Sequence, residues 1–137
     1  MAGDDTDAVT TDRALRVVVA DNDPGALELV VTDLRLEGHE IVGRCLDGAA
    51  ALEACRTEHP DVVVLDHRMP PGPHGLAVAQ RLAADGPDLR VIVHTNYQDA
   101  ALVEAIRACG AVYVPKGSLR ALRRAVRGPD RPSRPGG

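Results

Sequence analysis

Four polar residues in the sequence could together carry out phosphoryl chemistry, and each lies within two residues of the end of a short apolar run. They are Asp21, Asp66, Thr95 and Lys116. Carboxylate oxygens bind Mg²⁺, an ammonium group neutralises phosphoryl oxygens, and a hydroxyl donates a hydrogen bond to one of them. The residue types therefore predict a phosphoryl-transfer site, provided that the fold brings the four positions together.

The local sequence favours a site role for two of these residues. Lys116 is the only lysine among the 16 lysine and arginine residues, and it follows an apolar run, which indicates that a compact ammonium group is required there. Asp66 precedes the loop HRMPPGPHG and is too early to cap the helix expected from about Gly75. Asp23, in contrast, precedes Pro24 and is predicted to be a helix N-cap.

The apolar runs predict strands that are covered on both faces, because their apolar residues are continuous and do not alternate with polar ones. Four strong runs and one weaker, edge-like run predict strands at 17–20, 40–45, 62–65, 91–93 and 112–114. Helical spacing and end signals predict helices at about 24–38, 48–58, 75–84, 98–109 and 118–127. This alternation predicts an α/β fold: a doubly wound, five-stranded parallel sheet with helices on both faces. Ligands bind such sheets at the carboxyl ends of the strands, where the four polar residues fall.

Length and composition predict a single domain core. The chain has 137 residues, of which 45% are hydrophobic and 26% charged, as in ordinary globular proteins. No apolar run exceeds four residues and the first residues are acidic, which excludes a membrane span and a secretory signal and predicts a cytoplasmic protein. Three cysteines without CxxC spacing argue against disulfides and zinc. We expect a domain at 15–127 between two disordered tails, an acidic one at 1–14 and one rich in Pro, Gly and Arg at 128–137.

Four segments of the sequence resemble the receiver domains of bacterial two-component response regulators, the CheY-like family. They are VVVADNDP, DVVVLDHRMP, VIVHTN and YVPK. The resemblance covers about residues 15–127 and implies the flavodoxin-like strand order 2-1-3-4-5. It also implies a phosphoacceptor domain that receives a phosphoryl group from a sensor histidine kinase or a phosphotransfer protein and is not a turnover enzyme.

The resemblance assigns roles to individual residues. Asp66 would be the phosphorylated aspartate, Thr95 would contact the phosphoryl group together with Lys116, and Tyr113 would be the switch aromatic residue. The positions that hold Mg²⁺ in the family are Asp21, Asn22, Asp66 and the backbone carbonyl of Arg68. Asn22 departs from the family, which usually has a second acid there. A neutral amide is a poorer ligand for a hard cation, so we expect weak metal affinity.

The resemblance also predicts an output surface. Phosphorylation would draw Thr95 toward the phosphoryl group and let Tyr113 turn inward, which changes the surface formed by the last two helices and the strand between them. The final helix carries Arg120, Arg123, Arg124 and Arg127 along one side. We expect these arginines to support a homodimer or a docked partner, whereas the downstream effector cannot be read from the sequence.

Three alternative functions have weaker support in the sequence. Asn22 leaves open a pseudo-receiver that works without phosphorylation. Asp21 and Asp23 also form a D-x-D pattern like that of haloacid dehalogenase-like phosphohydrolases, but the later acidic pair that those enzymes need is missing. The arginines of the final helix could bind nucleic acid. The net charge of −4 and the lack of Phe and Trp argue against that function, because an acidic body repels phosphates and stacking platforms are missing.

Overall fold

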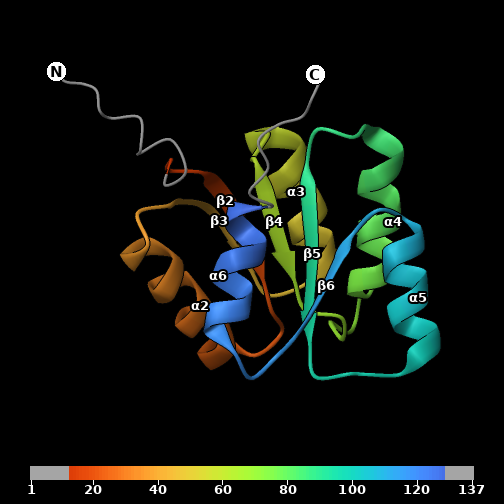
Figure 1. Cartoon of the computed structure of the whole chain (residues 1–137). Coiled ribbons are helices and arrows are strands. Elements are labelled where there is room, and N and C mark those ends of the chain that lie inside the picture. Colours follow the sequence, from red (N-terminus) through yellow and green to blue (C-terminus); the bar gives the residue numbers. More distant parts are fainter. Residues whose placement is uncertain (1–12, 129–137) are drawn as a thin grey trace, which may run out of the picture.

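The structure, a computed structural model, describes residues 13–128 as alternating strands and helices (Figure 1). The elements in chain order are β2 (Arg16–Ala20), α2 (Pro24–Leu36), β3 (Glu40–Cys45), α3 (Gly48–Glu58), β4 (Val62–Leu65), α4 (Gly75–Asp85), β5 (Arg90–Thr95), α5 (Ala100–Ala108), β6 (Val112–Pro115) and α6 (Leu119–Arg127). The strands form one parallel sheet in the order β3-β2-β4-β5-β6. This is the predicted order 2-1-3-4-5, so the fold prediction is confirmed. The predicted tails at 1–14 and 128–137 lie almost entirely outside the described residues.

Helices cover both faces of the sheet, as the continuous apolar runs predicted. On one face Val17 and Val19 of β2 pack with residues of α2 and α6, and on the other Val18 packs with residues of α3, α4 and α5. Figure 1 shows the two layers, with α2 and α6 together on one side of the strands. The valines of β2 are at most 1% exposed. β3 is the partly exposed edge strand that its weaker pattern indicated.

Side chains at the helix N-termini fix where the helices begin. Asp23 and Ser118 accept hydrogen bonds from Ala26 and Ala121, so both predicted N-caps are present. The helix expected at 98–109 begins later, at Ala100, because Asp99 acts as its cap. β5 extends through Thr95, beyond the apolar run that predicted it. None of the helices in residues 13–128 has the length and hydropathy needed to cross a bilayer.

The proline-rich loop after β4 is anchored by two imidazoles. His67 Nδ1 accepts the Leu76 N–H at 3.4 Å, and His74 Nδ1 accepts the Met69 N–H at 3.2 Å. Met69 is fully buried in the core. The two hydrogen bonds thus join the first part of the loop to its last residues and to the first turn of α4. His74 is exposed, whereas His67 is partly buried.

Candidate functional site

Three of the four predicted site residues meet at the carboxyl edge of the sheet. The Lys116 ammonium donates a hydrogen bond to Asp21 Oδ2 at 2.8 Å and lies 3.5 Å from Asp66 Oδ1. The Asp21 side chain is 5% exposed, and those of Asp66 and Lys116 are 14% and 19% exposed. A partly open site of two carboxylates and one ammonium group results, with Asp66 accessible to solvent.

Backbone hydrogen bonds position these residues. The Asp21 N–H donates to the Cys45 carbonyl at 3.0 Å, and the Asp66 N–H donates to the Ala20 carbonyl at 2.9 Å. The Lys116 N–H donates to the Thr95 carbonyl, also at 2.9 Å. The sheet ladder therefore continues one residue beyond each strand. Because the strands are parallel, these continuations place residues from distant parts of the sequence at one edge.

The charges at this edge influence one another. Burial and the neighbouring Asp21 raise the pKa of Asp66, although Lys116 and the His67 N–H act in the opposite direction. Burial works to lower the pKa of Lys116, but its hydrogen bond to Asp21 and the charge of Asp66 outweigh burial and raise that pKa. Lys116 thus stays charged. Two carboxylates against one ammonium group leave excess negative charge, which favours a bound cation.

The residues at this edge fit Mg²⁺ with a reduced set of charged ligands. Asp21 and Asp66 are close enough to share Lys116, and their oxygens are the hard ligands that Mg²⁺ prefers. Asn22 points its amide nitrogen at the carbonyls of Leu46 and Pro70. Among residues 13–128 no cluster of three or more His, Cys, Asp and Glu side chains is arranged to hold a metal. Two carboxylates are therefore the charged ligands available, with Asn22 and the Arg68 carbonyl as the predicted neutral donors.

Thr95 and Tyr113 are linked through Tyr97, which lies two residues after Thr95. Thr95 Oγ1 accepts the Tyr97 N–H at 3.2 Å, and the Tyr113 hydroxyl donates to the Tyr97 carbonyl, also at 3.2 Å. The Tyr97 hydroxyl accepts from the Arg68 guanidinium at 3.1 Å. Tyr97 therefore joins the loop after Asp66 to both predicted switch residues. Tyr113 is already partly buried and hydrogen-bonded, so the predicted turn would change an existing contact.

His94 is a buried group that the sequence analysis did not single out. It is 6% exposed, and its Nε2 has no hydrogen-bond partner in the described part of the chain. Burial and the nearby Lys116 lower the pKa of His94 to about 4, with Asp21 acting in the opposite direction. His94 is therefore neutral at pH 7, because a second buried cation beside Lys116 is unfavourable. The only signal in the sequence was its place next to Thr95.

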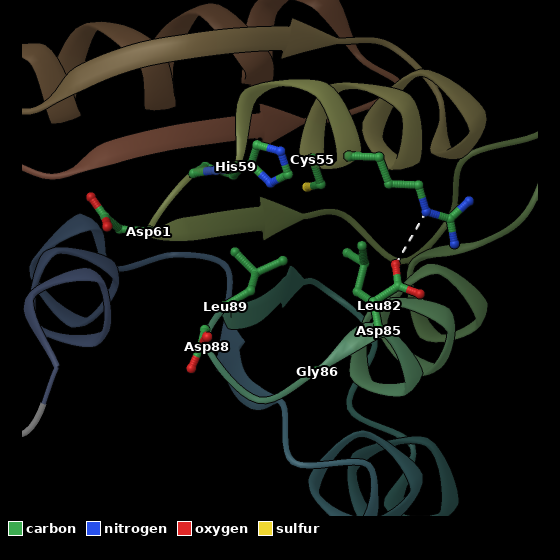
Figure 2. A pocket seen from close by; sticks show the side chains of 10 residues that line it. Cys55, His59, Asp61, Leu82, Asp85, Gly86, Asp88 and Leu89 are labelled. Carbon is green, nitrogen blue, oxygen red and sulfur yellow. Dashed lines mark hydrogen bonds and ion pairs between the residues drawn. The ribbon is translucent and has the colours of Figure 1, made fainter.

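A cavity of about 470 Å³ lies at the end of the sheet opposite the site, where the strands begin (Figure 2). Its lining residues include Cys55, Pro60 and Leu89, which form apolar surface, and Asp88. Several of these residues precede β4 or β5, so the cavity opens at the amino ends of the strands. The Arg56–Asp85 ion pair, at 3.1 Å, spans α3 and α4 beside it. This cavity is separate from the carboxylate and lysine site.

Comparison with known proteins gives the same family that the site indicates. The family model described as response regulator receiver domain matches residues 17–127. A solved receiver domain of the putative response regulator NarL from Mycobacterium tuberculosis is 36% identical, with a TM-score of 0.76, over 81% of this chain and 92% of that one. The chain belongs to the response regulator receiver domain family.

Two curated relatives from Mycobacterium tuberculosis are longer than this chain. The probable transcriptional regulatory protein NarL is 39% identical over 108 residues, which are 77% of this chain and 50% of that protein. The DNA-binding transcriptional activator DevR/DosR is 36% identical over 93 residues, which are 67% of this chain and 41% of that protein. The chain thus spans half or less of the length of these relatives.

Proposed function

We propose that this chain is a phosphoacceptor switch in which Asp66 receives a phosphoryl group from a sensor histidine kinase or a phosphotransfer protein in the cytoplasm. The observation that supports this role is the placement of Lys116 between Asp21 and Asp66 at a solvent-accessible strand end. Family membership supports the same class of partner, because receiver domains act with histidine kinases. The kinase and the downstream effector are not specified by these residues.

The proposed transfer uses the Asp66 carboxylate as the nucleophile. One oxygen of Asp66 forms a bond to phosphorus while the bond from phosphorus to the donor imidazole nitrogen breaks, and the leaving histidine keeps the electron pair and takes a proton from solvent. Lys116 lies close enough to neutralise charge on a phosphoryl group attached to Asp66. Thr95 Oγ1 accepts the Tyr97 N–H through a lone pair, so its hydroxyl proton remains available for donation to a phosphoryl oxygen.

Receiver domains generally use Mg²⁺ for phosphorylation. Asp21, Asp66 and the Arg68 carbonyl would hold the ion here, where its charge would offset that of the phosphoryl oxygens. Asn22 contributes no negative charge to this set. The affinity is therefore expected to be weaker than that of a site with three carboxylates.

Incubation with acetyl phosphate and Mg²⁺ should add one phosphoryl group to the wild-type chain and none to Asp66→Ala. Intact-mass spectrometry measures the added mass, and Asp88→Ala is a matched control because it removes an exposed carboxylate outside the site. Labelling of Asp66→Ala at the wild-type level would disprove the assignment. A wild-type chain that stays unlabelled would favour the pseudo-receiver, and sustained phosphate release from a generic phosphomonoester would favour a phosphohydrolase. Asp23 is less suited to that enzyme, because its carboxylate already caps α2.

We further propose that α5, β6 and α6 form the output surface, where a second copy or another partner docks. Tyr113 of β6 is hydrogen-bonded to the loop that carries Tyr97, so a change at Thr95 reaches this surface directly. The arginine stripe of α6 is smaller than the sequence suggested. Arg123 pairs with Asp33 of α2 at 2.6 Å, and Arg127 lies 3.9 Å from Glu37. Arg120 and Arg124 remain for contacts with a partner.

A beryllofluoride-type phosphoryl mimic should promote self-association or change Tyr113 fluorescence. Sedimentation velocity with and without the mimic measures the first effect, and Asp66→Ala is the control that cannot be occupied. Arg120→Ala combined with Arg124→Ala should weaken association. Arg44→Ala should not, because Arg44 pairs with Glu28 and lies on β3, the outer strand farthest from β6. Unchanged sedimentation and fluorescence while Asp66 is occupied would exclude this output surface.

A further inference from the structure

We propose that Asn22 is a positioning residue that ties together the two loops beside the proposed metal site. The inference rests on the proposed function, because it concerns the same edge of the sheet. The sequence alone indicates only that Asn22 is a poorer metal ligand than the usual acid. The structure adds a second role, in which the Asn22 amide holds neighbouring loops. The role follows from which atoms the amide contacts.

The Asn22 amide nitrogen bridges two segments that are distant in the sequence. It donates to the Leu46 carbonyl at 3.3 Å and to the Pro70 carbonyl at 3.2 Å. Leu46 directly follows β3, and Pro70 lies in the proline-rich loop between β4 and α4. One side chain in the loop after β2 thus connects the loops after β3 and β4. The bridge crosses three neighbouring strand ends of the sheet.

Both partners of Asn22 are carbonyl oxygens, so the residue at this position has to be a hydrogen-bond donor. An ionised aspartate offers only acceptor oxygens and would place its charge beside two carbonyl dipoles. The acid that usually occupies this position in the family therefore cannot form this bridge. Compared with aspartate, the Asn22 amide lacks a unit of negative charge but donates two hydrogen bonds, which hold the loops after β3 and β4.

The bridge also bears on the metal ligands. Pro70 lies two residues after Arg68, whose backbone carbonyl is a predicted Mg²⁺ ligand. The Asn22–Pro70 hydrogen bond limits where that stretch of backbone can lie when no metal holds it. Asn22 therefore acts on the metal site through the position of the Arg68 carbonyl. We expect Asn22→Asp to have two opposing effects: a carboxylate is gained for the metal, and the arrangement of the metal-free loop is lost.

Hydrogen exchange of the loop separates these two effects. In EDTA, the amides of a peptide covering residues 66–76 should exchange about threefold to tenfold faster in both Asn22→Asp and Asn22→Ala than in wild type. The reason is that each variant loses the two hydrogen bonds that Asn22 donates. In saturating Mg²⁺, Asn22→Asp should return toward the wild-type rate, whereas Asn22→Ala should not. Asn96→Asp is the matched control. It makes the same charge change at an exposed residue of the same edge and should leave this peptide unchanged in EDTA.

Wild-type exchange rates for both Asn22 variants in EDTA would overturn the proposal. So would acceleration in Asn22→Asp alone, because that result would reflect added charge and not a lost bridge. The outcome is independent of phosphorylation. If the wild-type chain does not label at Asp66 but both variants exchange the loop amides faster in EDTA, the Asn22 bridge is supported and the proposed function is wrong.

Discussion

Replacing His94 with leucine should abolish much of the loss of stability that the folded protein shows between pH 7.5 and pH 5. Burial holds the pKa of His94 at about 4 in the folded state, against 6.5 for a free imidazole. The unfolded chain therefore binds one more proton than the folded chain in this window, and stability falls as the pH falls from about 6.5 toward 4. The loss attributable to His94 is about 2 kcal/mol at pH 5 and roughly 3 kcal/mol below pH 4.

Urea unfolding in EDTA at pH 7.5 and pH 5 measures this effect. At pH 7.5 His94→Leu should be as stable as wild type or more stable, because it removes a buried nitrogen that has no partner in the described residues. His59→Asn is the control, since it removes an exposed imidazole at a left-handed position that asparagine tolerates. If His94→Leu and wild type lose the same free energy of unfolding between the two pH values, His94 does not titrate as described.

The general arrangement of the site could be predicted from the sequence because a parallel sheet relates strand ends in a simple way. Each buried run, such as VVVL before Asp66, identifies a central strand, and the residue after it must lie at the carboxyl edge. Lys116 and Asp21 are 95 positions apart, yet the parallel direction of the strands places both residues at the carboxyl edge of the sheet. No side-chain packing had to be known for that step.

Side-chain partners across elements were not predictable in this way. Whether Arg123 faces a partner or pairs with Asp33 depends on how α6 packs beside α2, which no local pattern specifies. The two carbonyls held by Asn22 likewise belong to loops whose paths are set by the fold as a whole. The three hydrogen bonds of Tyr97 likewise arise only when the loop after β4, the end of β5 and strand β6 meet.

Gly75→Ala should both destabilise the protein and displace the phosphoacceptor. Gly75 is the buried first residue of α4, and its N–H donates to the His67 carbonyl at 2.7 Å. A Cβ at this position would overlap the Asp66 carbonyl oxygen and approach the His67 Cα to 2.9 Å. Both contacts involve backbone, so a side chain cannot rotate away to relieve them. We expect a loss of about 1–3 kcal/mol or more in the free energy of unfolding.

The overlap at Gly75 also tests how precisely Asp66 has to be placed. The overlap can be relieved only if the backbone that carries the Asp66 carboxylate moves. Labelling by acetyl phosphate should therefore slow at least tenfold, even at temperatures where the variant is folded, as expected when a nucleophile is misplaced by about 1 Å.

Gly25→Ala is the matched control. Its added Cβ would lie 3.7 Å from Asp23 Oδ2 near the start of α2, where alanine should stabilise the helix by about 0.4–1 kcal/mol. Circular dichroism confirms folding of each variant, and chemical unfolding and intact-mass labelling give the two readouts. A Gly75→Ala variant with wild-type stability and labelling would show that the α4 start can shift independently of Asp66.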